Sequence, residues 1–158
     1  MGLVKKFEEI RKDDILDVGG KGANLGEMVS ADIAVPPGFV VTSDAYRRFL
    51  KENGLNELFL RTMNEAQDDP EKLRAAAALF REKILSSTLP SEIVSEVTAA
   101  YNSLSVKCGI PHSSCSSIFG NSRGFTGVRF CRAAETYLNV IGLSDVLEQI
   151  VRCYASLR

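Results

Sequence analysis

Glycine and proline interrupt the first ninety residues of this chain at short intervals. Glycines stand at 19, 20 and 22 around Lys21, a Pro-Pro-Gly break stands at 36–38, and Pro70 and Pro90 follow. Because glycine commonly ends helices and proline is tolerated only in their first turn, no element runs uninterrupted across these points. The chain is therefore expected to fold into short elements, whose type the apolar spacing between the breaks predicts.

The apolar residues recur at helical spacing in most of these segments. A β-branched and aromatic run at 39–42 predicts a strand, and a second strand is expected at 136–140. Ser43 or Asp44 is expected to cap the helix that Gly54 ends, and Asp69 to cap the helix that Pro70 opens. The fold class predicted is α+β, with helices around a small sheet. Helices are expected at 23–31, 45–53, 55–64, 70–84, 90–104 and, from a cap at Ser144, up to 158.

Composition and charge exclude several classes of protein. Hydrophobic residues make up 45% and charged residues 25%, which is typical of globular chains. The 19 Lys+Arg and 20 Asp+Glu leave a net charge of -1, which argues against a dedicated nucleic-acid binder. No apolar run is long enough for a membrane span, and the N-terminus has no apolar signal core. We therefore expect a cytoplasmic protein without nucleic-acid or membrane partners.

The stretch 106–134 differs in character from the rest of the chain. It contains no Asp or Glu, although the chain holds twenty, and it carries four basic residues. It is rich in Ser and Gly and shows neither helical nor strand periodicity. Its cysteines and His112 make no zinc-binding pattern, and we predict no metal ligand and no catalytic residue in the chain.

Several strings outside this stretch carry a family resemblance. They are DVGGKGANLGEM at 17–28, VPPGFVVT at 35–42, DAYRRF at 44–49 and ETYLNV at 135–140. Together they resemble the N-terminal nucleotide-binding region of the phosphoenolpyruvate synthase (pyruvate, water dikinase) family. Pyruvate phosphate dikinase and rifampin phosphotransferase share that region. The resemblance implies that 1–158 is a partial N-terminal ATP-binding domain, with the fold of the first lobe of an ATP-grasp-like domain.

The resemblance also implies the site residues. Lys21 lies in a glycine-rich turn whose backbone N–H groups can approach phosphate oxygens, and its ammonium supplies a point charge. Relatives then carry VAVRSSATAEDLP, in which the arginine grips phosphates, and FAGQQETY, in which the glycine and threonine contact the nucleotide. Counting back from Glu135, Ser117 holds the arginine position and Arg132 the glycine position, whereas Thr136 matches. The implied ATP-binding residues are therefore Lys21 and Thr136.

A change of reading frame explains why the segment before Glu135 departs from the family's pattern. Each residue from Ser114 to Ala134 admits a codon built from the third base of one family codon and the first two bases of the next. The lengths agree without a gap. The segment 106–134 is thus interpreted as aberrant, with the family's phosphate-gripping string read out of frame over about 114–134.

The function implied is ATP binding in an enzyme that converts ATP, pyruvate and water into phosphoenolpyruvate, AMP and phosphate. Because the last helix is expected to run to Arg158 and relatives are several times longer, we expect a truncated chain, inactive alone. In such relatives the Mg²⁺ ligands and the pyruvate site would lie beyond Arg158. The alternatives are a part of a rifampin phosphotransferase-like or pyruvate phosphate dikinase enzyme, and a non-catalytic interaction module.

Overall fold

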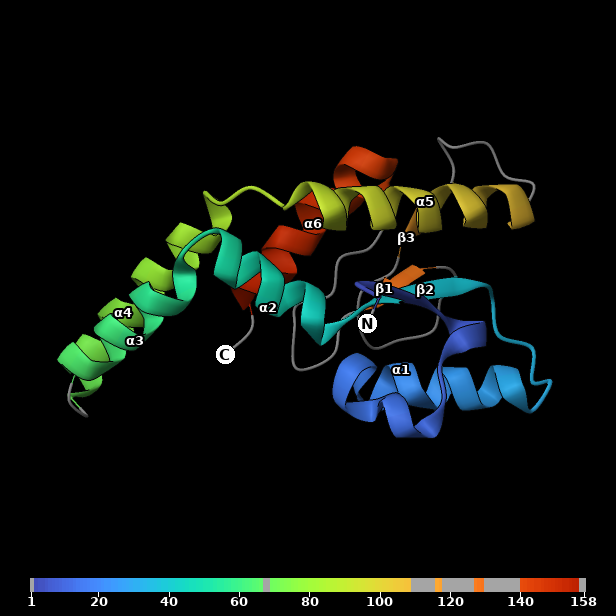
Figure 1. Cartoon of the computed structure of the whole chain (residues 1–158), viewed down its shortest axis with the longest axis horizontal. Helices are drawn as coiled ribbons and strands as arrows, with labels where there is room; N and C mark the ends of the chain where they lie inside the picture. The colour runs from blue at the N-terminus through green and yellow to red at the C-terminus, as the bar shows by residue number, and fades with distance from the viewer. Residues whose placement is uncertain (1, 67–68, 109–115, 118–126, 130–139, 157–158) are drawn as a thin grey trace.

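The computed structural model describes residues 2–66, 69–108, 116–117, 127–129 and 140–156. Along the described part of the chain, single short strands precede the first and the second helix, a run of consecutive helices follows, and short strands again precede the last helix (Figure 1). Two short 3₁₀ turns, η1 (Phe7–Glu9) and η2 (Lys12–Asp14), separate the first strand from the first helix. The helices are α1 (Ile15–Ser30), α2 (Ser43–Glu52), α3 (Leu55–Ala66), α4 (Pro70–Leu85), α5 (Ser91–Cys108) and α6 (Leu143–Ser156). The strands are β1 (Val4–Lys6), β2 (Gly38–Val41), β3 (Ser116–Ser117), β4 (Gly127–Arg129) and β5 (Val140–Ile141).

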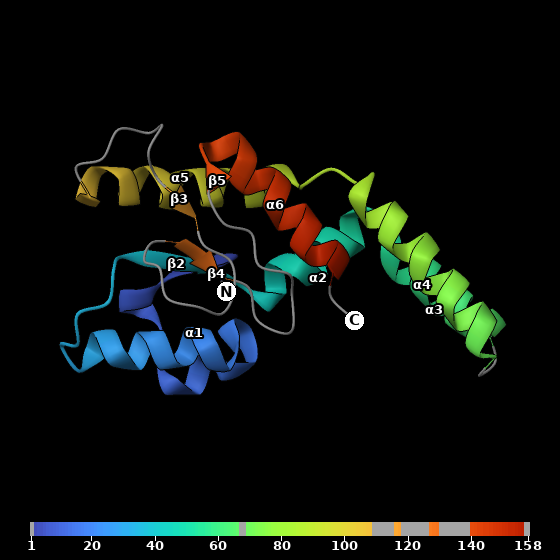
Figure 2. The same cartoon turned by 180° about the vertical axis from the view of Figure 1, so that it is seen from behind.

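The main sheet lies between two layers of helices. In the described part of the chain its order is β1-β2-β4, with β1 antiparallel and β4 parallel to the central strand β2. Helix α1 covers one face, α5 and α6 lie on the other side, and α3 and α4 project away as a hairpin (Figures 1 and 2). Strands β3 and β5 form a separate antiparallel pair. This arrangement agrees with the expected α+β class.

The central strand β2 connects the two halves of the core. All four of its residues are buried, and their side chains alternate between the faces of the sheet. Phe39 and Val41 belong to the larger apolar cluster, whereas Val40 belongs to the smaller cluster under α1. A glycine followed by three apolar residues therefore suits a strand that is covered on both sides.

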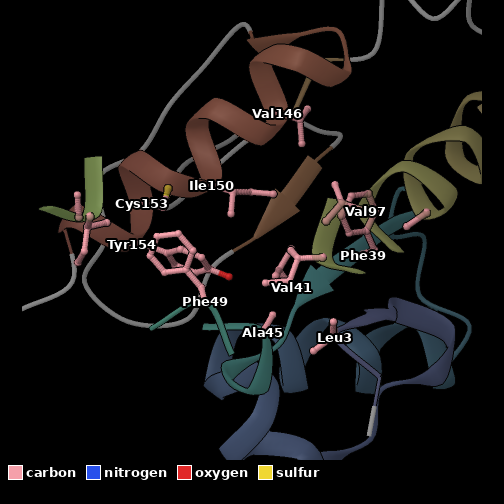
Figure 3. Packing of buried hydrophobic residues seen from close by; sticks show 14 of the residues in the cluster. Leu3, Phe39, Val41, Ala45, Phe49, Val97, Val146, Ile150, Cys153 and Tyr154 are labelled. Carbon is pink, nitrogen blue, oxygen red and sulfur yellow. The ribbon is translucent and has the colours of Figure 1, made fainter. Parts of the chain in front are cut away.

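The larger cluster is built where α2 and α6 meet beside the sheet. The Tyr154 ring lies 4.8 Å from the Tyr46 ring and 5.1 Å from the Phe49 ring, measured between centroids. Ile150 and Tyr154 of α6 point toward the same interior as Phe49 and Val41 (Figure 3). Aromatic pairs at these separations add to the free energy gained by burial.

Most of the expected elements are confirmed. The strand at 39–42 corresponds to β2, and the four expected helices between 45 and 104 correspond to α2, α3, α4 and α5. The Asp69 carboxylate accepts from the backbone N–H groups of Glu71 and Lys72 at 3.0 and 3.4 Å, as a helix cap does. Gly54 has a φ of 65° just after α2, as expected of a helix stop.

The structure corrects some boundaries and caps. Thr42 is the N-cap of α2, and the Ser43 hydroxyl instead donates to the carbonyl of Leu16 at 3.2 Å. Helix α6 begins at Leu143, one residue before the expected cap. Of the strand expected at 136–140, only Val140 lies within the described residues, and it begins β5.

Three strands in the described part of the chain were not expected from the sequence. Strand β1 was not predicted, and β3 and β4 lie in the stretch that shows no periodicity. The helix expected from residue 23 begins at Ile15, so the three glycines lie inside α1. Across the described residues, no helix combines the length and the apolar character that a membrane crossing needs.

Candidate functional site

The glycine-rich turn is a break inside α1. Gly19 has φ 67° and ψ 174°, so the backbone leaves the helical conformation at that residue and resumes it at Gly20. A positive φ is readily adopted by glycine and strains most other residues. The break divides α1 into a short first half that ends at Val18 and a longer second half that opens on Gly20, Lys21 and Gly22.

The glycines after the break have different surroundings. A Cβ added at Gly22 would lie 3.0 Å from the Cβ of Val18 and 3.4 Å from Cγ2 of Val40, so this position packs closely against strand β2. A Cβ added at Gly20 would meet no atom within 4 Å. Gly22 thus brings the helix close to the sheet, and Gly20 faces open space at the start of the second half.

Lys21 is exposed on the first turn of the second half. Among the described residues it has no carboxylate partner. The first half of α1 is held beside the start of α2 by the bond from Ser43 to Leu16, and α2 follows directly after β2. The break therefore lies near the carboxyl end of the parallel pair β2 and β4, the edge at which sheets of this kind commonly bind ligands.

A small charged cluster fixes the first half of α1 to the sheet. The Lys5 ammonium of β1 lies 2.7 Å from Oδ1 of Asp14 and 3.6 Å from Oδ2 of Asp17. The hydrogen bond to Asp14 raises the pKa of Lys5, and the same bond, together with the Arg11 N–H at 2.8 Å, lowers the pKa of Asp14. Both shifts mean that the charged forms are favoured in the folded protein.

The structure describes only some of the residues at the expected nucleotide-binding positions. Lys21 is described in full, whereas Arg132 and Thr136 lie outside the described residues. Ser117 is described only through its backbone, which pairs with Val140 in the smaller sheet. The roles of these positions at the nucleotide stay predictions.

A small cavity lies at the other end of α1. It measures about 210 Å³ and is lined by residues that include Val29 of α1, Lys6 of β1 and Ser103 of α5. The Lys6 ammonium donates to the Ser103 hydroxyl at 3.3 Å. Because Lys21 is not among its lining residues, this cavity is separate from the glycine-rich turn.

Sequence reasoning missed the charged cluster around Lys5. Strand β1 is three residues long and contains two lysines, so it carries no alternating apolar signal. The only available signal was the acidic content of 13–17, which also suits a solvated helix start. Within the described ranges, no group of three or more His, Cys, Asp or Glu side chains is arranged to hold a metal ion.

Comparison with known proteins decides the family. Residues 15–158 match the family described as "Pyruvate phosphate dikinase, AMP/ATP-binding domain". The chain belongs to this family. The match begins at the first residue of α1 and includes the whole glycine-rich turn, so the resemblance read from the sequence is confirmed.

Curated relatives support the same family assignment. The chain is 34% identical to a probable phosphoenolpyruvate synthase of Pyrococcus horikoshii, over 98% of the chain and 23% of the relative. It is 32% identical to the phosphoenolpyruvate synthase of Pyrococcus furiosus, over the same shares. It is 37% identical to that of Aeropyrum pernix, over 98% of the chain and 19% of the relative. The chain thus spans about a fifth of the length of these relatives.

Proposed function

We propose that this chain binds ATP, with the phosphates held at the glycine-rich turn of α1 and Lys21 as the cation that contacts them. The observation that carries the proposal is the family match, which starts at residue 15 and includes this turn. The family's description names AMP and ATP as the ligands. Thr136 would contact the same nucleotide from outside the described residues.

The geometry of the turn supports a phosphate site. The second half of α1 restarts at Gly20, and the first N–H groups of a helix lack acceptors one turn earlier. Such groups and the helix dipole favour an anion at that end. Gly20 leaves open space there, and the exposed side chain of Lys21 lies on the same turn without a carboxylate partner among the described residues.

The relatives support a proposal for the wider activity. The chain would supply ATP binding in a phosphoenolpyruvate synthase, as the first lobe of an ATP-grasp-like domain covering 1–158. The pyruvate site and the Mg²⁺ ligands would belong to other parts of such an enzyme. The described carboxylates form no metal-binding group, so we assign no step to Mg²⁺ in this chain.

The isolated chain is expected to bind ATP weakly and to transfer no phosphoryl group. Ser117 replaces the bidentate arginine with one hydroxyl, so charge-assisted hydrogen bonds to phosphate are lost. Arg132 adds bulk where a glycine would let the backbone approach the ligand. Phosphoryl transfer also requires metal ions and a positioned acceptor.

A titration of the chain with ATP, followed by the backbone amide signals in NMR spectra, tests the proposal. We expect millimolar affinity, shifts at residues 19–23, and loss of binding in Lys21→Met. Lys83→Met removes an exposed lysine from the remote hairpin and is the matched control, with unchanged affinity expected. Equal affinity in Lys21→Met and in the original chain would refute the proposed phosphate site.

A second candidate is a non-catalytic interaction module. It is favoured by the apolar side chains that α3 exposes, among which Leu60 is 61% and Phe59 44% exposed. The same titration separates the two candidates, because an interaction module would give no ATP-dependent shifts. Pyruvate-dependent release of AMP from labelled ATP would contradict the expected inactivity of the chain.

A further inference from the structure

Asp17 stands four residues before Lys21, on the opposite side of the break in α1. In an uninterrupted helix, an acid and a lysine at this spacing are neighbours on the surface and form an ion pair. Such a pair would compete with a phosphate for the lysine. The two residues are separated here by Gly19, at which the backbone leaves the helical conformation.

Asp17 is engaged instead by Lys5. Its Oδ2 lies 3.6 Å from the Lys5 ammonium, which also holds Asp14 at 2.7 Å. The side chains of Lys5, Asp14 and Asp17 are only 19%, 24% and 19% exposed, so solvent screens their interactions less than those of fully exposed pairs. Lys21 is exposed and has no carboxylate partner among the described residues.

We propose that Lys5 is a positioning residue for the nucleotide site, because it holds Asp17 and thereby keeps Lys21 available for phosphate. The inference rests on the proposed function of Lys21. Lys5 lies on β1, where it pairs with Val40, and acts on the ligand only through Asp17. Lys5 neutralises the acid that precedes the break, so Asp17 does not compete with a phosphate for the ammonium of Lys21.

The test is a set of charge-matched variants of the chain. Lys5→Met releases Asp17, and we expect ATP affinity to fall about two- to fivefold, the range of a competing surface ion pair. Lys5→Met combined with Asp17→Asn should regain the original affinity. Lys5→Met combined with Asp14→Asn carries the same net charge but leaves Asp17 free, so it should stay weak. Lys5→Arg should bind as the original chain does.

A second measurement does not depend on the nucleotide. The rate at which an amine-reactive reagent acylates Lys21, read by mass spectrometry of the peptide that contains it, reports whether the amine is paired. We expect Lys5→Met to slow this labelling about twofold and the further change Asp17→Asn to restore it. Lys6→Met, on the same strand with Ser103 as its partner, should leave the rate unchanged.

The outcomes separate this inference from the proposed function. Loss of binding in Lys21→Met with no effect of Lys5→Met would overturn the role of Lys5 alone. Equal rescue by Asp17→Asn and Asp14→Asn would show general charge compensation and would also overturn it. ATP binding that is indifferent to Lys21 would refute the proposed function, whereas the labelling rates would still decide whether Lys5 controls the pairing of Lys21.

Discussion

The glycines of α1 are required for two different reasons within one helix. Gly19 supplies a positive φ, whereas Gly22 and Gly26 supply the absence of a side chain where the helix meets its neighbours. A Cβ at Gly26 would lie 2.5 Å from the carbonyl oxygen of Ile10. A Cβ at Gly20 would meet no atom within 4 Å, so a change there should affect the proposed phosphate site more than the fold.

Gly26→Ala is predicted to destabilise the protein. The added methyl group would also lie 2.7 Å from the Cβ of Ile10. Ile10 is fully buried, and a Cβ cannot move without its backbone, so α1 would have to shift. Overpacking of this kind costs about 1–3 kcal/mol of unfolding free energy. Urea denaturation measures it. Gly20→Ala is the control, with unchanged or slightly higher stability expected because its Cβ meets nothing.

The stabilising effect of the Asp14 charge should disappear in acid. Its pKa is lowered from the ordinary value of 3.8, chiefly by the hydrogen bond from Lys5, so the folded state favours the ionised form. A lowered folded pKa contributes stability above the unfolded pKa and loses it as pH falls through the folded value. Melting temperatures of the original chain and Asp14→Asn should therefore differ at pH 7 and converge at about pH 2. A constant difference across this range would contradict the assignment.

Among whole elements, those with local signals were the predictable ones. Asp69 and Pro70 mark the start of helix α4 in the sequence, and a compact apolar run predicts β2. Strand β1 could not be predicted, because its pairing with β2 decides its conformation and its own residues are mostly polar. Strand β4 is likewise formed by backbone pairing with β2, without any periodic signal.

The capping of α4 can be tested directly. Asp69→Ala removes the acceptor of the Glu71 and Lys72 N–H groups and should lower the unfolding free energy by about 0.5–2 kcal/mol. Asp69→Asn keeps an acceptor oxygen and should retain most of the stability. Circular dichroism during thermal unfolding gives both values. Equal losses in the two variants would assign the effect to the charge of Asp69 rather than to the cap.

The candidate site was predictable where a sequence motif and a local conformation coincide. The glycine-rich turn around Lys21 was expected, and the structure adds that the turn is a break within a helix and that Lys21 is exposed. The cluster of Lys5 with Asp14 and Asp17 was not expected, because it joins a strand to a helix through side chains only. Distances between such groups depend on the tertiary fold, which cannot be read from the spacing of residues in the sequence.

Considered as a whole, the molecule depends on the junction of α2, α6 and the sheet. Phe49→Ala should lower the unfolding free energy by about 3–5 kcal/mol, because Phe49 is fully buried against Tyr154. That is a large share of the roughly 5–15 kcal/mol that holds a domain folded. Phe59→Ala, at a position that is 44% exposed, should cost less in the same denaturation experiment. Similar losses would show that the hairpin is as important to stability as this junction.

The interpretation of 106–134 as a segment read out of frame leads to a prediction about the gene. Its DNA should contain one single-base slip between about codons 107 and 114 and an opposite slip near codon 134. The alternative frame between them should encode a string similar to VRSSAT. Resequencing of this region is the measurement, and unrelated residues in that frame would refute the interpretation.

The pairing register of the main sheet has a consequence for the order of folding. Lys6 pairs with Phe39, whereas Gly38 pairs with Gly127, so the second pairing closes a loop more than twice as long. Closing a longer loop loses more chain entropy, and distant pairings form more slowly. We therefore expect β1, α1 and β2 to assemble first and β4 to join last. A chain altered in 106–134 would then retain the early unit, which carries Lys21, and would be impaired mainly in the final step of assembly.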